Sequence, residues 1–579
     1  MKKIVPRNQK SIWKRAKRAP SASERPLLSR LMGLETEYVV LYRTQGETVD
    51  QVKFDFDRFS KCLSQELPIA KSFRNPYRVF LANGGCVSLE HGLSMNLRDV
   101  LVETASPECK SPKELLTYQL AMERILSRSI HKAFSTYDAQ LLKGSADSRG
   151  NTYGQHESYE LQIASKGWLL GWRLGLVCML PLLVSYRFLA GIWFLLIWLM
   201  SQITTPWIAV KRRWLRSSKP TELQSLEAGS FWGVHPHWLG LCAMGLRMLH
   251  LPLVAALWLN IRCFALIPHR RNLSAFFASR SIVDGAGYLD KRNRFWVSVR
   301  SALVNSVIGF GSYRNERPIF RCDGLLRGLC TGPVWTLGNY FQLFRQRQRI
   351  EVAIGDSGLC EQSQYVRLGS TALVLDLIEH SNAKLPRLTN VVEATTRFAK
   401  DWMLLSHVPG RSNIQWTALD IQHAYASEVR NFLQTHPNVP IEAWRILDQW
   451  QTTLNQLRPT EDESNLPRTM LGRIDWLSKL WILHQMKGET SWQARKKVDL
   501  RYHEISSEGY HHRLHQMLEL APILDEREIS KAARTPPTDT PATQRGYIVR
   551  EFSDDQNDLQ VNWTHADFQL EGQRNRVYF

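Results

Sequence analysis

The chain has 579 residues, of which 44% are apolar and 22% charged, which excludes a disordered protein and exceeds one ordinary domain. The formal net charge of +20 indicates an anionic partner, such as nucleic acid, nucleotide, acidic protein or anionic lipid, without choosing among them. The nine cysteines form no CxxC pair, which argues against a disulfide framework or a zinc site and favours a reducing cytosol.

Residues 1–30 form a basic segment with ten Lys or Arg residues and one acidic residue, Glu24. No apolar run follows, so the segment does not have the pattern of a secretory signal. We expect a solvated basic tail, and attraction to anionic lipid is the alternative.

The stretch "LMGLETEYVV" (31–40) predicts a half-buried strand. Side chains alternate along a strand, so Glu35 and Glu37 point the same way, about 7 Å apart. Two like charges on one face of a core strand repel each other, and this indicates that something else holds them there.

Acidic side chains recur on later strand-like segments. These segments are "NGGCVSLEHG" (83–92), which follows an Asn-Gly turn and places Ser88 and Glu90 on one face; Glu103 ahead of "SPEC" (106–109); and "DSRGNTYGQHESYEL" (147–161), which contains His156 and Glu157. Carboxylates on successive strands indicate a site for a hard cation such as Mg²⁺. Solvated strand edges are the alternative.

Residues 165–268 differ from the rest of the chain, because nine of the 20 tryptophans lie between Trp168 and Trp258. The 23 residues from Phe188 to Val210 carry no formal charge, which is long enough to span a bilayer. The basic run "KRRWLRSSK" (211–219) would mark the cytoplasmic side.

These features predict a transmembrane hairpin within 167–210 that turns near 185–187, with both ends in the cytosol. A second, weaker apolar block covers 231–246 and 248–261 and would form another hairpin or an interfacial pair. A tryptophan-rich buried helical subdomain is the alternative.

The remainder returns to a soluble composition, with a clear helix at 370–381 and a Pro-rich segment at 535–546. The expected division is a basic tail, a first catalytic part, a hydrophobic helical insertion, a second catalytic part and a small C-terminal domain, at 1–30, 31–164, 165–268, 269–499 and 500–579.

The order and residue patterns of the motifs resemble those of the Pup ligases and depupylases, the glutamine-synthetase-like enzymes of prokaryotic pupylation. The matching segments are "LMGLETEY", "LANGGCVSLEHG", "VETASPEC", "LLKGSADSRGNTYGQHESY", "SRSIVDGAG", "IGDSGLCE", "LGSTALVLDLIE", "TALDIQHAY" and "LQVNWTH". The resemblance covers 31–164 and 269–579, and 165–268 looks like an insertion.

The resemblance implies an α+β fold: a curved antiparallel sheet backed by helices, with a small C-terminal domain. It implies ATP and Mg²⁺ on the concave face. The partners would be Pup or a Pup-like protein and target proteins, with membrane lipid at the insertion and no nucleic acid. The ligase joins the C-terminal Glu of Pup to a target lysine through a glutamyl phosphate.

Carried over position by position, the resemblance implies metal ligands at Glu35, Glu103 and, less directly, Glu157. Glu90 falls at the position of the family's catalytic Asp, which acts as the base in the ligase. Ser106 and Trp563 fall at nucleotide-contacting positions.

Several positions depart from the family pattern. Cys86 replaces an Arg that contacts the nucleotide, and a thiol cannot bind phosphate as Arg does. Ser88 replaces a Tyr, Glu90 replaces an Asp, and Glu351 stands at a His position. About nine residues are inserted between Glu90 and Glu103. Arg321 and Arg349 are candidates to compensate for the missing Arg.

These departures leave three alternatives. The first is an active pupylation-type ligase held at the cytoplasmic face of a membrane. The second is a depupylase of the same family. The third is a degenerate homologue that binds Pup or nucleotide without catalysis.

Overall fold

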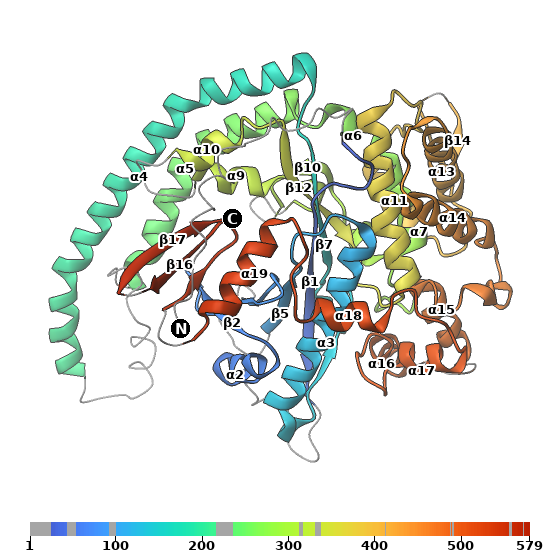
Figure 1. Ribbon diagram of the computed structural model, residues 1–579, viewed down its shortest axis with the longest axis horizontal. Coiled ribbons are helices and arrows are strands. Elements are labelled where there is room, and N and C mark those ends of the chain that lie inside the picture. Colours follow the sequence, from blue (N-terminus) through green and yellow to red (C-terminus); the bar gives the residue numbers. More distant parts are fainter. Residues whose placement is uncertain are drawn as a thin grey trace, which may run out of the picture.

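The computed structural model describes residues 25–42, 54–73, 75–91, 100–215, 236–311, 316–330, 337–411, 413–486, 488, 491–554, 558–570 and 572–579. One large sheet runs through the molecule, with most helices on one side of it (Figure 1). The basic tail before residue 25, the loop 92–99 between Glu90 and Glu103, and residues 216–219 of the basic run lie outside the described residues.

The sheet has 13 strands in the order β10-β11-β12-β7-β1-β5-β4-β3-β2-β15-β16-β17, and β6 pairs with β1 outside this path. Its strands are β1 (Met32–Leu41), β2 (Ile69–Ser72), β3 (Arg78–Leu81), β4 (Cys86–His91), β5 (Val100–Ala105), β6 (Gln140–Leu142), β7 (Gln155–Gln162), β10 (Ser306–Gly309), β11 (Pro318–Arg321), β12 (Arg347–Gly355), β15 (Gln560–Val561), β16 (His565–Leu570) and β17 (Gln573–Tyr578). Two small sheets pair β8 (Tyr288–Leu289) with β9 (Phe295–Trp296) and β13 (Val408–Pro409) with β14 (Gln415–Trp416).

The α-helices of the first half are α2 (Phe56–Glu66), α3 (Pro112–Ala133), α4 (Lys166–Leu215), α5 (Pro236–Phe264), α6 (Ile267–Ser279), α7 (Ser281–Asp284) and α8 (Val299–Ala302). Those of the second half are α9 (Asp323–Cys330), α10 (Gly338–Gln342), α11 (Glu361–His380), α12 (Val391–Lys400), α13 (Ala418–Thr435), α14 (Ile441–Gln456), α15 (Asp475–His484), α16 (Trp492–Tyr502), α17 (Tyr510–Met517), α18 (Glu526–Ala532) and α19 (Pro541–Phe552).

The expected fold is confirmed: a large sheet is backed by helices. All described pairings are antiparallel except β10–β11 and β2–β15, so the sheet is mixed. The strands of the expected C-terminal domain extend this same sheet, because β15 pairs with β2. Residues from far apart in the sequence therefore meet along one surface.

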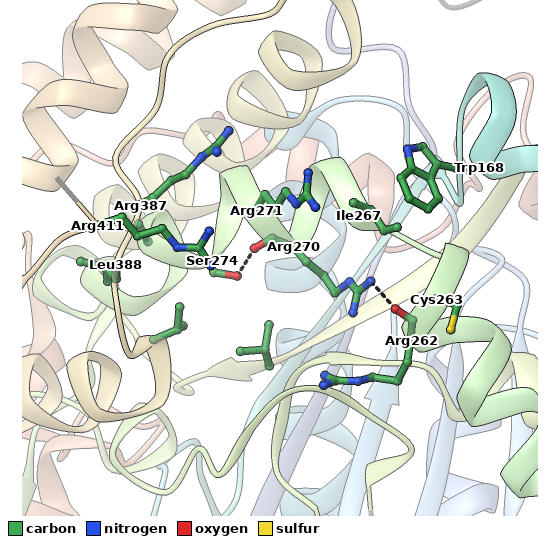
Figure 2. Close-up of a pocket in the computed structure, with 13 residues that line it drawn as sticks. Trp168, Arg262, Cys263, Ile267, Arg270, Arg271, Ser274, Arg387, Leu388 and Arg411 are labelled. Atoms are coloured by element: carbon green, nitrogen blue, oxygen red, sulfur yellow. Dashed lines mark hydrogen bonds between the residues drawn. The ribbon is translucent and has the colours of Figure 1, made fainter.

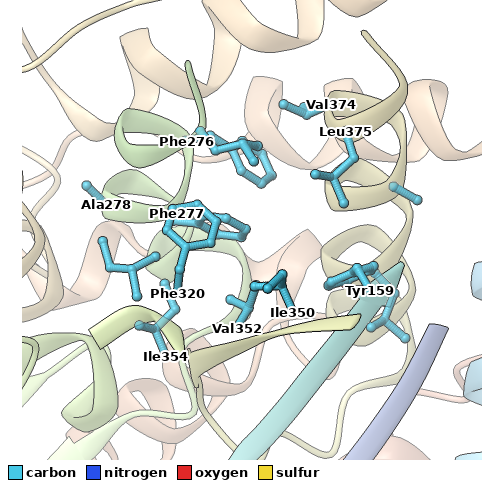
Figure 3. Close-up of a cluster of buried hydrophobic side chains, with 14 of the residues drawn as sticks. Tyr159, Phe276, Phe277, Ala278, Phe320, Ile350, Val352, Ile354, Val374 and Leu375 are labelled. Atoms are coloured by element: carbon cyan, nitrogen blue, oxygen red, sulfur yellow. The ribbon is translucent and has the colours of Figure 1, made fainter. Parts of the chain in front are cut away.

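The main core fills the space between the sheet and helices α6 and α11 (Figure 3). Phe276 and Phe277 of α6 and the fully buried Val374 of α11 face apolar side chains of the sheet, such as Ile350 on β12. Alternation along each strand then leaves the opposite face of the sheet for polar side chains.

The segment 165–268 forms a long helical hairpin whose geometry differs from the prediction. The predicted turn near 185–187 is wrong, because α4 continues unbroken through these residues and its partner is α5 (Figure 1). Arg187 is buried and donates a hydrogen bond to the Leu329 carbonyl at 3.0 Å. A polar side chain at this point therefore docks the helix on the domain instead of marking a loop.

The first half of α4 packs on the domain along one stripe. Trp172, Leu176 and Leu183 are fully buried, and the Trp172 indole donates to the Leu343 carbonyl at 3.0 Å. The opposite side of α4 is exposed and apolar from Leu170 to Ile203. We call it the outer strip; it consists of Leu170, Leu174, Val177, Val184, Phe188, Ile192, Leu195, Leu199 and Ile203.

By length and composition, two helical stretches could cross a membrane. They are Lys166–Ile203, with a mean hydropathy of 1.9, and Gly240–Phe264, with 1.6. Core helices of soluble proteins can be as long and as apolar, but they are mostly buried, whereas only 17% and 24% of the 18-residue apolar segments within these two stretches are buried.

Candidate active site

The acidic residues of β1, β4 and β5 meet on the face of the sheet away from the helices. In the strand register, Glu37 lies opposite Glu103, and Glu103 lies opposite Ser88. The Ser88 hydroxyl donates to Glu103 at 3.2 Å. The expectation that Glu35 and Glu37 share a face agrees with this register, because neighbouring paired residues point to the same side.

Crowding of these carboxylates changes their protonation. Burial, together with the charges of Glu35, Glu90 and Glu37, raises the pKa of Glu103 to about 7. Burial and the nearby Glu37 also raise the pKa of Glu90. The structure thus contains an excess of negative charge on this face, which a divalent cation would relieve.

A second set of ligand-type side chains lies beside the first. Glu35 is opposite His156 in the register, and the carboxylates of Glu35 and Glu351 and the His156 ring lie within 4.8 Å of one another. Two carboxylates and an imidazole are a donor set that suits a divalent cation. The residues present therefore fit a metal on this face.

Within this second set, the charges are partly paired. His156 Nδ1 lies 2.9 Å from Glu351, and Arg321 donates to Glu351 at 3.0 Å. Burial opposes ionisation, but the hydrogen bond and charge of His156 lower the pKa of Glu351 to about 2. Arg349 donates to Glu35 at 2.7 Å, so a guanidinium occupies part of the space around the expected metal ligand.

Glu157 does not lie with the other acids, which corrects the expectation that it faces the metal. It is fully buried on the helix side of the sheet, and it accepts hydrogen bonds from Arg280 at 2.7 and 3.0 Å. Arg280 outweighs burial and lowers the pKa of Glu157. The alternation along β7 decides this outcome, because His156 takes the place on the acidic face.

Ser106 and Trp563 line one pocket together with Glu35. The pocket has a volume of about 330 Å³ and also includes Glu108 and Arg349. The Ser106 hydroxyl accepts from the Leu34 amide at 2.9 Å, which fixes it at the pocket wall. Three residues predicted from separate motifs therefore surround one cavity beside the acids.

Trp563 is held by residues of the N-terminal strands and of α19. Its ring meets that of Phe80 edge to face, with centroids 5.2 Å apart, and the Arg545 guanidinium stacks 4.6 Å from its centroid. Arg545 is fully buried, donates to the Gly84 carbonyl at 2.8 Å and pairs with Glu108. It ties α19 to the Asn83-Gly84 turn.

Cys86, the departure from an Arg in the family pattern, is buried, and burial raises the pKa of its thiol to about 12. The group is neutral and supplies no positive charge. A neighbouring arginine is available instead, because Arg78 lies opposite Ser88 on β3 and its charge acts on Glu103.

Four residues of this region had no predicted role: Arg78, His156, Glu351 and Arg545. The Asn-Gly turn could have pointed to Arg78, since it joins β3 to β4, and in this hairpin residue 78 lies opposite residue 88. His156 lies opposite Glu35 only through the register of β7 on β1, which neither strand specifies by itself. No local signal points to Arg545.

The mixed sheet backed by helices on one face, with acidic side chains and a pocket on the other, is a glutamine-synthetase-like fold. The chain belongs to the Pup-ligase family: the family model described as Pup-ligase protein matches residues 30–567. Among curated relatives, a Pup–protein ligase of Acidimicrobium ferrooxidans is 24% identical over 95% of this chain and 94% of its own length. A Pup deamidase/depupylase of Mycobacterium tuberculosis is 31% identical, over 52% of this chain and 58% of its own.

Solved structures share the fold. The ligase PafA in its complex with the prokaryotic ubiquitin-like protein Pup gives a TM-score of 0.62 at 19% identity, covering 95% of this chain and 89% of that one. PafA in complex with ADP gives 0.57 at 19% identity, covering 93% of each chain. At this identity the similarity shows the fold alone.

Proposed function

We propose that this protein is an ATP-dependent ligase of the pupylation type. It would join the side-chain carboxylate of the C-terminal Glu of a Pup-like protein to the amine of a target lysine. The observation that carries the proposal is the crowded row of carboxylates, Glu37, Glu103 and Glu90, beside a pocket lined by Ser106 and Trp563. The match to a Pup–protein ligase covers nearly the full length of both chains, whereas the match to a depupylase covers about half of this chain. This difference supports ligation more than depupylation.

The reaction would proceed in two displacements. A carboxylate oxygen of the Pup-like protein attacks the γ-phosphorus of ATP, and ADP leaves. The lysine amine then attacks the carbonyl carbon of the acyl phosphate, phosphate leaves and the amine loses a proton. Glu90 would accept this proton, which agrees with its raised pKa.

The chain's residues would bind the reactants on two sides. Trp563 offers an aromatic surface to the nucleotide, and the Ser106 hydroxyl lies at the same wall. Glu35 and Glu103 would hold Mg²⁺, with His156 and Glu351 as further candidates. When bound, Mg²⁺ would neutralise charge on the transferred phosphoryl group.

A second candidate is a degenerate homologue that binds a Pup-like protein or nucleotide without turnover. The Arg349–Glu35 ion pair favours it, because this pair neutralises an expected metal ligand. The buried, uncharged Cys86 favours it too.

ATP hydrolysis and conjugate formation by purified protein, with and without a Pup-like protein, separate these candidates. The ligase predicts Mg²⁺-dependent turnover that Glu35→Ala abolishes. Binding without turnover in every condition supports the degenerate homologue, and release of a Pup-like protein from conjugates supports a depupylase. Glu526→Gln on the exposed surface of α18 is a matched control.

We further propose that the α4–α5 hairpin attaches the protein to the cytoplasmic face of a membrane by lying in its surface. The apolar stretch Lys166–Ile203 has 38 residues, which makes a helix of roughly 57 Å. The hydrocarbon core of a bilayer is only roughly 30 Å thick. An integral crossing through 167–210 does not fit this geometry, because the inner side of the first half is packed on the domain.

The charges at the ends of the hairpin support a position in the membrane surface. Lys211, Arg212 and Arg213 lie at the far end of α4, while Arg262 lies near the domain. A crossing hairpin would place the basic far end outside the cytosol, against the usual distribution of charge. A hairpin in the surface keeps both basic ends beside lipid headgroups.

Extraction tests this attachment. Carbonate at high pH should release the protein from membranes, while a transmembrane hairpin would resist release. A chain that stays in the supernatant without detergent and without carbonate would contradict both forms of attachment. Phe188→Glu combined with Leu195→Glu, in the outer strip, should weaken membrane binding without changing ATP turnover.

A further inference from the structure

Five arginines gather in one pocket on the helix side of the sheet, away from the acidic face. This arginine pocket has a volume of about 480 Å³ and contains Arg262, Arg270, Arg271, Arg387 and Arg411 (Figure 2). They come from the last turn of α5, from α6 and from the loops on either side of α12. Segments more than a hundred residues apart thus supply like charges to one cavity.

The described part of the chain offers these arginines no acidic partner. No lining residue is acidic, and none of the five arginines forms an ion pair there. Their recorded side-chain hydrogen bonds go to neutral oxygens: Arg270 to the Arg262 carbonyl at 2.9 Å, and Arg387 to Asn272 at 3.4 Å. Elsewhere in this protein, buried arginines such as Arg280 and Arg545 are paired with carboxylates.

Arg270 is the most buried of the five arginines. Its Nε is buried and has no hydrogen-bond partner. Burial, together with the charges of Arg262 and Arg271, lowers its pKa. Both conditions would be relieved by an anion whose oxygens reach several guanidinium groups, as phosphate oxygens do.

The position of the pocket identifies the source of that anion. Trp168, in the first turn of α4, and Cys263, in the last turn of α5, both line it, so the pocket lies where the apolar hairpin joins the domain. Trp168 is 44% exposed, and an exposed tryptophan at the end of an apolar helix is typical of the boundary between water and lipid.

We propose that the arginine pocket binds the phosphate of an anionic phospholipid headgroup while the outer strip contacts the acyl chains. This inference rests on the proposed membrane attachment and adds a lipid preference to it. Apolar contact alone would not distinguish headgroups, whereas unpaired arginines beside the strip would select anionic lipid.

Vesicle flotation of the full-length protein tests the proposal. Vesicles of phosphatidylcholine alone are compared with vesicles enriched in phosphatidylglycerol. The Arg387→Gln/Arg411→Gln variant removes two exposed arginines of the pocket, and Arg128→Gln/Arg292→Gln removes two exposed arginines elsewhere as the control.

We expect tighter binding to the anionic vesicles, and we expect the pocket variant to lose about fivefold in affinity for each arginine removed. The control variant should lose clearly less, and binding to neutral vesicles should change little. Equal losses in both variants would overturn the pocket and leave membrane attachment standing. Absence of flotation on any vesicle would instead overturn the attachment itself.

Two further measurements separate other anions from the lipid headgroup. Titration with inorganic phosphate and with a short-chain phosphatidylglycerol should show tighter binding of the lipid and weaker lipid binding by the pocket variant. Equal affinities would overturn the lipid assignment in favour of free phosphate. A pocket variant that binds vesicles normally but loses affinity for an acidic Pup-like protein would assign the pocket to that partner.

Discussion

The two faces of the central sheet treat carboxylates in opposite ways. On the helix side, Glu157 is fully buried but bonded twice to Arg280, and its pKa falls. On the other side, Glu103 shares its surroundings with three more glutamates, and its pKa rises to about 7. The first arrangement stabilises the fold, while the second is costly to the free protein and indicates a site for a cation.

The largest expected effect concerns the paired face. Glu157→Gln removes the carboxylate that the buried Arg280 and Arg367 share, and leaves Arg280 with Asp284 alone, so we expect a loss of about 3–5 kcal/mol in the free energy of unfolding. Denaturant unfolding measures it. Glu160→Gln is the matched control on the same strand, since its half-buried pair with Arg25 should contribute at most about 1 kcal/mol. Similar losses in both variants would contradict the contrast between the faces.

On the acidic face, the same substitution should affect activity instead of stability. Glu103→Gln removes a proposed metal ligand and one of four crowded charges. We expect a loss of about 10²–10³ in the rate of ATP turnover, with stability unchanged or slightly raised at neutral pH. Turnover assays and thermal unfolding are measured together. A variant that unfolds as readily as Glu157→Gln would show that Glu103 is structural.

The pH dependence of stability follows from the raised pKa of Glu103. Between pH 4.5 and 7 the folded protein retains a proton on this carboxyl that the unfolded chain releases. Stability therefore falls as pH rises through this window, by roughly 3 kcal/mol. Thermal unfolding should show the fall in the wild type and a smaller one in Glu103→Gln. Added Mg²⁺ should restore stability above pH 7 and have little effect near pH 5.

The smallest expected effect concerns Arg349, the one cation paired with Glu35 in the described residues. If Mg²⁺ displaces this guanidinium, Arg349→Gln should tighten Mg²⁺ binding by about fivefold, as expected for loss of an exposed ion pair. Calorimetric titration with Mg²⁺ measures this. Weaker binding would mean that Arg349 supports the site, and Arg345→Gln, a nearby exposed arginine, controls for the lost charge.

The sequence predicted much of the acidic face, because strand alternation is a local property. It placed Glu35 with Glu37, and the Asn83-Gly84 turn set the strand that carries Glu90. It did not decide between His156 and Glu157, which are adjacent and point to opposite faces. That choice depends on which residue of β7 lies opposite Glu35. The register between two distant strands cannot be read from the sequence of either strand.

The hairpin shows a different limit of sequence reasoning. The apolar composition of 167–210 predicts a membrane hairpin that turns near Arg187. In the structure its guanidinium reaches a carbonyl of α9, a segment about 140 residues later. Composition alone does not reveal such a partner. It located both apolar regions but divided the first of them, which is one helix in the structure.

The pairing of β15 with β2 has a consequence for how this protein is made. Trp563 reaches the pocket only after β15 has joined a strand almost 490 residues earlier in the sequence, so a growing chain lacks this pocket wall until residues 558–570 have been synthesised. Contacts of such long range form late in folding. A chain cut before residue 558 would retain the acidic row but lose Trp563. Nucleotide binding at this pocket would thus indicate that β15 has joined the sheet.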